Sequence, residues 1–216
     1  MRIVLMGGGG HASDVLGAIE AVNAEAGSEK DKIEIAGILA DDELDMGRFA
    51  RRNVSQVGGI GDITSIDASH YISCVGYPKG RKIVANKADK SDKAAAIIIH
   101  PRAWVPAGTV IGPGTVVLAG VCVSPCAKLS DHVYLSHGSL VGHDCDVGDF
   151  VSIMPGAGIS GDTHLGEGCL IGANATVLQT VRIGAWATLG AGAVAAKDVP
   201  ENATAVGIPA KVLLRE

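Results

Sequence analysis

Aromatic residues are scarce in this chain of 216 residues, since two Phe, three Tyr and two Trp make up 3% of it. A core with so few rings must be built from aliphatic and small side chains, which suits a repetitive structure with a narrow interior. The chain also lacks basic runs, and its formal net charge is −5. This charge pattern argues against a nucleic-acid partner or a membrane-surface partner.

Long apolar segments are also absent, and none approaches the length needed to span a bilayer. The apolar start Met1–Met6 lacks a secretory cleavage pattern, so we read it as a first strand. The cysteines are odd in number and unevenly spaced: Cys74, Cys122, Cys126, Cys145 and Cys169. We therefore expect a reduced, cytoplasmic protein without a membrane partner.

Glycine is abundant, with 30 residues, and the second half of the chain carries a period of six. Every sixth residue is Val, Ile or Leu: Val105, Ile111, Val117, Val123, Leu129, Leu135, Val141, Val147, Ile153, Ile159, Leu165, Ile171, Val177, Ile183 and Leu189. The fifth position of each hexapeptide holds nothing larger than Val. The second position is often Gly, which we attribute to backbone conformations that side chains forbid.

This period predicts a prism of short parallel strands, in which each hexapeptide forms one side and one corner. Three sides make a coil, so equivalent residues stack every 18 positions and each coil buries the face of its neighbour. The helical spacing near 3.6 is absent. The repeat is uninterrupted, so we expect no long loop between coils. Parallel connections are usually right-handed, but the spacing alone leaves the hand of the prism open.

Residues 1–100 lack this period and read as a Rossmann-like α/β domain. Strand Arg2–Met6 leads through four glycines into a helix over Ser13–Ala26, and further strands are expected at Ile33–Leu39 and Ile72–Val75. In such a βαβ arrangement ligands bind at the carboxyl ends of the strands. We therefore divide the chain into a first domain over 1–100 and a β-helix with a C-terminal tail over 101–216.

The glycine turn Gly7–Gly10, followed by His11 and Ala12, fits the dinucleotide-binding fingerprint loosely. It either receives a phosphate at a helix N-terminus or is a tight turn without a ligand. Asp41 and Asp42 follow the second strand, where they either accept hydrogen bonds from a base or ribose or cap a turn.

Three segments together are distinctive: the glycine turn ending at His11, Val141–Cys145 with its His-Asp pair, and Val206–Lys211 near the end. With them, the whole chain resembles the sialic-acid O-acetyltransferase and bacillosamine N-acetyltransferase family (NeuD/PglD-like). The resemblance implies a homotrimer of left-handed parallel β-helices with acetyl-CoA in the groove between adjacent prisms. It also implies that the N-terminal domain holds a nucleotide-sugar that reaches into the same groove.

By this resemblance His143 is the catalytic base, and Asp144 is the acidic residue that raises its basicity. Gly10 and His11 match the turn that contacts the nucleotide-sugar, and Asp41 and Asp42 match the acidic pair near the base. The positions implied for acetyl-CoA are Ser152, Gly161, Ala173, Ala191 and Lys211. Ser152 stands where some members carry a histidine. The loop Gly76–Arg81 departs from the usual Gly-Asp/Asn-Asn form.

Acetyl transfer to an amine needs a general base, and imidazole titrates near neutrality. His143 and His137 both hold the third position of a hexapeptide, so both should point outward, where either is otherwise a solvated or interface histidine. No metal is expected, because six-residue spacing places neighbouring histidines on different sides of the prism. We interpret Cys145 and Cys169 as packing residues.

We therefore predict an acetyl-CoA-dependent N-acetyltransferase acting on the amino group of a nucleotide-linked 4-amino-4,6-dideoxy sugar. The close alternative is a sugar O-acetyltransferase of the sialic-acid type. Two other classes stay open: an NAD-dependent oxidoreductase built on the first domain, and a β-helix that is structural or carbonic-anhydrase-like.

Overall fold

A computed structural model of the protein describes residues 1–49 and 52–213. The chain divides into two compact units, Met1–Pro101 and Arg102–Glu216, close to the boundary expected after residue 100. The last three residues of the expected second domain, 214–216, lie outside the described residues.

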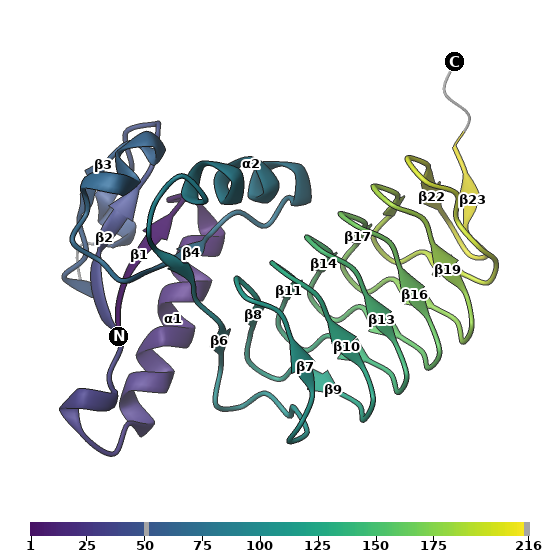
Figure 1. Cartoon of the computed structure of the whole chain (residues 1–216). Coiled ribbons are helices and arrows are strands. Elements are labelled where there is room, and N and C mark those ends of the chain that lie inside the picture. Colours follow the sequence, from purple (N-terminus) through teal and green to yellow (C-terminus); the bar gives the residue numbers. More distant parts are fainter. Residues whose placement is uncertain (50–51, 214–216) are drawn as a thin grey trace. The chain divides into compact units, whose positions relative to one another are not determined.

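The first unit is a parallel sheet with helices. Its elements are β1 (Arg2–Met6), α1 (Gly10–Glu25), η1 (Glu29–Asp31), β2 (Glu34–Leu39), η2 (Met46–Arg48), β3 (Gln56–Gly58), η4 (Ile60–Ser65), β4 (His70–Ser73), α2 (Pro78–Ala88), β5 (Ala94–Ala95) and β6 (Ile98–Ile99). Five of these strands form a sheet in the order β3-β2-β1-β4-β5, with β1 at its centre (Figure 1).

The continuous apolar run of β1 explains its central place, because a strand covered on both faces needs apolar residues at consecutive positions. Ile3 to Met6 are all fully buried. Helix α1 buries one face at helical spacing, with Val15, Leu16 and Ile19 inside. It starts at Gly10, three residues before the expected Ser13, because the glycine turn is shorter than the sequence suggested. The predicted strand Ile72–Val75 is displaced toward the N-terminus, as β4.

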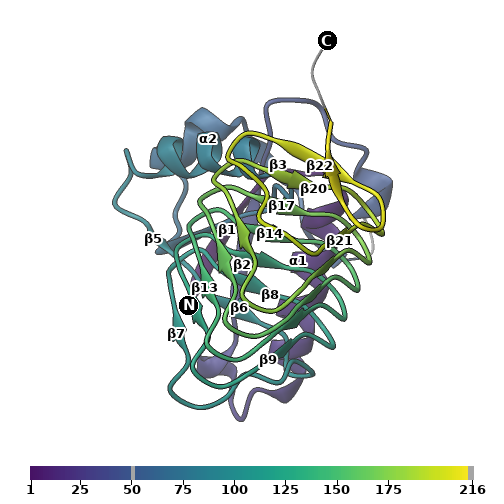
Figure 2. The ribbon, with the colours of Figure 1, turned by 90° about the vertical axis from the view of Figure 1, so that its right-hand side faces the viewer.

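The second unit is a β-helix of two-residue strands spaced by six. They are β7 (Val110–Ile111), β8 (Val116–Val117), β9 (Cys122–Val123), β10 (Lys128–Leu129), β11 (Tyr134–Leu135), β12 (Leu140–Val141), β13 (Asp146–Val147), β14 (Ser152–Ile153), β15 (Gly158–Ile159), β16 (His164–Leu165), β17 (Leu170–Ile171), β18 (Thr176–Val177), β19 (Arg182–Ile183), β20 (Thr188–Leu189) and β21 (Val194–Ala195). Figure 2, viewed from the C-terminal end of the stack, shows each coil as a three-sided loop.

Every third strand pairs in parallel, which confirms the predicted stacking at 18 residues: Lys128 pairs with Asp146, and Asp146 with His164. From Val117 to Leu189 every sixth residue is at most 1% exposed. Six-residue spacing persists without inserted loops. The stack ends with β22 (Thr204–Val206), parallel to β20, and β23 (Lys211–Val212), antiparallel to β22. None of the helices in the described ranges is long and apolar enough to cross a membrane.

The explanation given above for the second-position glycines is wrong. The left-handed backbone, with φ between 55° and 83°, recurs at the fourth position of each hexapeptide, from Gly108 to Gly192, and includes Asp144 and Asp162. The second-position glycines instead permit close packing of coils. A Cβ on Gly172, for example, would lie 2.5 Å from the backbone nitrogen of Ala191 in the next coil.

Candidate active site

His143 and Asp144 form a pair at the corner between β12 and β13. Asp144 has a left-handed backbone, with φ of 57°, and the chain turns at this residue. The Nδ1 atom of His143 lies 2.7 Å from Oδ2 of Asp144, and the two side chains are 57% and 58% exposed. When the carboxylate accepts a hydrogen bond from Nδ1, the neutral ring presents the lone pair of Nε2 to a ligand.

Gly161 lies beneath the His143 ring, one coil further along. A Cβ on Gly161 would come within 2.5 Å of Cε1 and Nε2 of His143, so only glycine lets the ring rest there. The main chain fixes the same contact, because the N–H of Asp162 donates to the carbonyl of His143 over 2.8 Å. The corner thus holds a histidine, its carboxylate partner and the backbone of Gly161 together.

Gly161 is a buried residue whose N–H points to no main-chain acceptor within residues 1–49 and 52–213. Gly142 packs against the same nitrogen, because a Cβ there would sit 2.6 Å from it. A backbone donor beside an imidazole is the arrangement that stabilises an oxyanion while a base removes a proton.

Ala173 and Ala191 hold the same third position as Gly161 and also donate to no backbone carbonyl of the described chain. They lie one coil apart, where the carbonyl of Ala173 accepts from the N–H of Gly192 over 2.8 Å. Their corner leads into β18 and β21. These strands belong to the sheet β9-β12-β15-β18-β21. His143 lies at the corner that follows β12, a strand of the same sheet. Three positions predicted for acetyl-CoA therefore border one face of the prism.

Ser152 and Lys211 lie elsewhere. Ser152 is fully buried on β14, in a different sheet from the His143 corner, while Lys211 is exposed on β23. The structure does not bring these two residues together with His143, and their roles stay predictions. His137 is exposed at another corner, and the ring of His132 stacks on Phe150 with centroids 5.0 Å apart. Among the described residues no group of three or more His, Cys, Asp or Glu is arranged to hold a metal ion.

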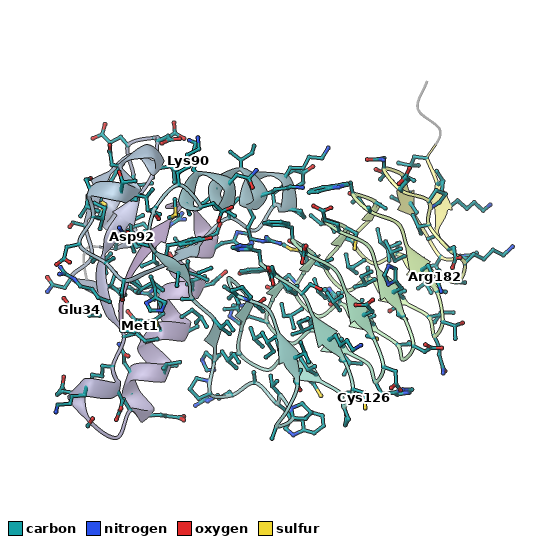
Figure 3. All side chains as sticks on the ribbon, viewed as in Figure 1. Met1, Glu34, Lys90, Asp92, Cys126 and Arg182 are labelled. Carbon is teal, nitrogen blue, oxygen red and sulfur yellow. The ribbon has the colours of Figure 1, made fainter. Side chains whose placement is uncertain are left out.

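A second histidine–aspartate pair was missed by the sequence analysis. Nδ1 of His164 lies 3.3 Å from Oδ2 of Asp146, on neighbouring strands of one sheet. Both line a groove of about 440 Å³ that begins at the His143 corner; its lining is Asp144, Asp146, Asp162, Thr163, His164, Thr180 and Arg182. Arg182 projects from β19 in Figure 3. Reading the repeat in steps of 18 would have placed 146, 164 and 182 on one face.

The glycine turn of the first unit leads directly into α1. Its N-cap residue, Gly9, offers no side-chain cap, and the first turn holds no acidic residue. The next residue in the predicted site, His11, lies against the backbone of Gly76, where a Cβ would overlap its ring. Burial lowers the pKa of His11; Asp14 opposes this effect and Arg81 adds to it.

Asp41 takes the turn-capping role. Its Oδ1 atom accepts from the N–H of Ile60 over 2.7 Å, and its Oδ2 atom lies 3.1 Å from Nζ of Lys87. The Ile60 hydrogen bond, then Lys87, hold the pKa of this carboxyl below its usual value. Asp42 is exposed beside it. Both carboxylate oxygens of Asp41 thus have partners within the first unit.

The family model "Bacterial transferase hexapeptide (six repeats)" matches residues 162–197. The acetyltransferase domain of PglB from Neisseria gonorrhoeae, solved with acetyl coenzyme A, is 30% identical with a TM-score of 0.86; the match covers 98% of each chain. A histidine-to-asparagine mutant of perosamine N-acetyltransferase from Caulobacter crescentus, solved with CoA and GDP-perosamine, is 27% identical with a TM-score of 0.87. That match covers 100% of this chain and 98% of the other.

The curated relatives match a smaller share of the chain than these two solved structures do. Serine acetyltransferase 4 of Arabidopsis thaliana is 36% identical over 139 residues, which are 63% of this chain and 35% of that protein. The serine acetyltransferase of Mycobacterium tuberculosis is 37% identical over 63% of this chain and 54% of its own length. The chain thus spans about half or less of the length of these curated relatives. The left-handed prism and the full-length similarity place the chain in the hexapeptide-repeat acetyltransferase family.

Proposed function

We propose that the protein is an acetyl-CoA-dependent N-acetyltransferase acting on the amino group of a nucleotide-linked 4-amino-4,6-dideoxy sugar. The observation that carries the proposal is the exposed His143–Asp144 pair resting on Gly161, whose N–H lacks a backbone acceptor within the described chain. Similarity over the whole chain to perosamine N-acetyltransferase, solved with CoA and GDP-perosamine, supports the choice of acceptor.

The corner supplies each group that the reaction needs. Nε2 of His143 takes a proton from the sugar amine as the amine nitrogen attacks the thioester carbonyl. Asp144 stabilises the imidazolium that forms, since an opposite charge at 2.7 Å favours the protonated ring. The N–H of Gly161 donates to the oxyanion of the tetrahedral intermediate. The intermediate collapses to the amide, and the departing CoA sulfur receives the proton from His143.

Acetyl-CoA is the co-substrate, and we infer that it follows the face bordered by Gly161, Ala173 and Ala191. Their third-position N–H groups are donors for the polar parts of a ligand. Ser152 is fully buried within its own sheet, so we expect it to contribute less to acetyl-CoA binding. Lys211 is exposed, and its ammonium is available to a CoA phosphate.

We further infer that the first unit is a Rossmann-like domain that holds the nucleotide. The order β3-β2-β1-β4-β5 agrees with that of doubly wound parallel sheets, in which ligands bind at the carboxyl ends of the strands. Gly10 and His11 lie at that end of β1, and Asp41 and Asp42 lie at that end of β2. The assembly is proposed to be a homotrimer working in the cytoplasm.

An acceptor panel tests the proposal. The purified protein is incubated with acetyl-CoA and, in separate reactions, UDP-, GDP- and dTDP-linked 4-amino sugars, sialic acid and L-serine, and products are identified by mass spectrometry. We expect an acetamido sugar nucleotide. L-serine is included because the curated relatives are serine acetyltransferases. O-acetylserine or O-acetylsialate as the sole product would overturn the choice of an amine acceptor.

A further inference from the structure

The peptide bond between Ser160 and Gly161 is held from its carbonyl side by two buried side chains. The hydroxyl of Thr163 donates to the carbonyl of Ser160 over 2.8 Å, and the thiol of Cys145 donates to the same oxygen over 3.2 Å. Cys145 is 1% exposed and Thr163 is 2% exposed. Burial raises the pKa of the Cys145 thiol, so the thiol keeps the proton that it donates. The N–H of this same peptide is the proposed oxyanion donor.

These side chains take the place of a main-chain hydrogen bond. At the corner of Ala173, the carbonyl of Gly172 accepts from the N–H of Ala175, three residues further on, over 3.0 Å. Across the described chain no backbone N–H donates to the carbonyl of Ser160, which holds the same second position as Gly172. The orientation of the Ser160–Gly161 peptide therefore depends in part on side-chain donors.

Hydroxyl and thiol groups replace apolar side chains inside the two coils that carry His143 and Gly161. Fifth-position residues stack from coil to coil, since the strands that follow them are paired. At this corner all four are buried, and in stacking order they are Ala127, Cys145, Thr163 and Val181. Packing is satisfied by an apolar residue in the outer two coils, so it does not by itself require the polar residues in the inner two.

A trans peptide is planar, and its C=O and N–H bonds point in opposite directions. The peptide between Ser160 and Gly161 is trans. Donors that fix the Ser160 carbonyl thus fix the direction of the Gly161 N–H, which is turned away from them. Hydrogen bonds to a carbonyl also polarise its peptide, which strengthens the N–H by about 10–30% per bond. A donor oriented before the reaction stabilises an oxyanion without first having to be turned.

We propose that Thr163 and Cys145 are positioning residues for acetyl transfer, which orient and polarise the Gly161 N–H through the carbonyl of Ser160. Cys145, predicted from the sequence to be a packing residue, then has a second role. The inference rests on the proposed function, because it takes that N–H to be the donor for the oxyanion. It does not depend on the choice of acceptor, since attack by an amine or by a hydroxyl forms an oxyanion from the same thioester.

Thr163→Val removes the hydroxyl and keeps the shape of the side chain. We expect kcat to fall roughly tenfold, less than the ~10²–10³-fold that loss of an oxyanion donor costs, because the N–H remains but is less firmly oriented. KM for both substrates should change by less than about threefold, since the oxyanion exists only after attack. Thr163→Ser, which keeps the hydroxyl, should retain kcat within about threefold. Cys145→Ala should lower kcat by a smaller factor than Thr163→Val, because a thiol is a weak donor.

Thr115→Val is the matched control for the loss of a buried fifth-position hydroxyl. Thr115 is fully buried, and its hydroxyl donates to the carbonyl of Ser130 over 3.1 Å at another corner. It also accepts from the N–H of Val133 over 3.2 Å, so its loss should lower the urea midpoint of unfolding at least as much as the loss of the Thr163 hydroxyl. Its kcat should nevertheless stay within about threefold of that of the wild type.

The amide signal of Gly161 in a ¹H–¹⁵N NMR spectrum reports the hydrogen bonds of its peptide without turnover. In Thr163→Val this signal should move, because the polarisation of the peptide changes. Thr115→Val should leave it in place. Cys145→Ala should also move it, and this variant carries the test if Thr163→Val does not fold.

A folded Thr163→Val protein with the kcat of the wild type, or with an unmoved Gly161 signal, would overturn the inference. An equal loss of kcat in Thr115→Val would do so too, because the effect would then be one of stability. O-acetylserine or O-acetylsialate as the sole product of the acceptor panel would instead overturn the proposed acceptor, and the loss of kcat expected in Thr163→Val would then be measured with that acceptor.

Discussion

Two histidines of the β-helix have an aspartate partner, and their surroundings distinguish them. His143 stands at a corner against Gly161, whose N–H lacks a backbone acceptor in the described residues. His164 lies on a strand, 3.3 Å from Asp146 on the neighbouring strand. Acetyl transfer needs a hydrogen-bond donor for the developing oxyanion close to the general base. This requirement favours His143 as the base.

Replacing His143 by Asn should therefore lower kcat/KM about 10²–10⁴-fold, the usual contribution of a general base. The same change at His164 removes a histidine that is 47% exposed, against 57% for His143, and that also has a carboxylate partner. It should alter kcat/KM by less than about threefold. Steady-state kinetics with the acceptor found in the panel checks both variants. A His164→Asn enzyme as impaired as His143→Asn would contradict the assignment of the general base to His143.

Gly161→Ala tests whether the imidazole must rest on the next coil. The new Cβ would lie 2.5 Å from Nε2 of His143, so the ring has to swing away. We expect kcat to fall roughly ten- to a hundredfold. In the His143→Ala background, where no ring is left to displace, Gly161→Ala should have much less effect on the residual rate. Additive losses in this double-mutant cycle would show that Gly161 acts independently of the ring.

At this scale the sequence supported some assignments better than others. The adjacency of His143 and Asp144 in the chain, together with the third-position rule, was sufficient to predict an outward pair. The capping of η4 by Asp41 was one of two readings, because the N–H of Ile60 that it binds lies 19 residues away and is brought near only by folding. The hydrogen bond of Thr163 gave no signal, since the fifth-position rule concerns only the size of a side chain.

The coil is the element that organises the second unit, and glycine at its second position sets how closely coils approach. Gly172 packs against the backbone of Gly190 and Ala191, where a Cβ would lie 2.7 and 2.5 Å from main-chain atoms. Backbone cannot rotate away as a side chain does. Coils must separate locally to admit even a methyl group.

Gly172→Ala should therefore lower the free energy of unfolding by about 1–3 kcal/mol, as overpacking in a core does. Gly17→Ala is the matched control within α1, because a Cβ there meets nothing within 4 Å. That substitution should instead raise stability by about 0.5–1 kcal/mol, since alanine loses less backbone entropy in a helix. Urea unfolding followed by circular dichroism measures both. A neutral Gly172→Ala would mean that the coils are free to move apart.

Periodicity explains which elements the sequence could predict. Strands β7 to β21 follow from one rule repeated without interruption, so each position was set by its neighbours. The first unit has no such redundancy. Strand β3 is three residues long with a half-buried or exposed pattern, and α2 has only four apolar residues, so neither gave a usable period. These elements depend on packing against the sheet, where Tyr71, Val84 and Ala88 share one core.

At the scale of the whole molecule, two faces of the prism have opposite character. The outward residues of β7-β10-β13-β16-β19 include Lys128, Asp146, His164 and Arg182. Those of β9-β12-β15-β18-β21 carry no charge: Cys122, Leu140, Gly158, Thr176 and Val194. Leu140 is 43% exposed in the single chain. An uncharged face is the one that a homo-oligomer can bury at least desolvation cost.

We expect light scattering to give three times the chain mass of 21.9 kDa for the wild-type protein. Leu140→Glu should shift this mass toward that of one chain, because a carboxylate buried at the contact of a cyclic trimer is repeated in every subunit. Lys128→Glu on the charged face reverses a charge in water and should leave the trimer intact. Since the uncharged face is bordered by His143 and by Ala173, Leu140→Glu should also lose acetyl transfer in parallel with the trimer. A trimeric but inactive Leu140→Glu, or a monomeric wild-type protein with full activity, would separate the reaction from assembly through this face.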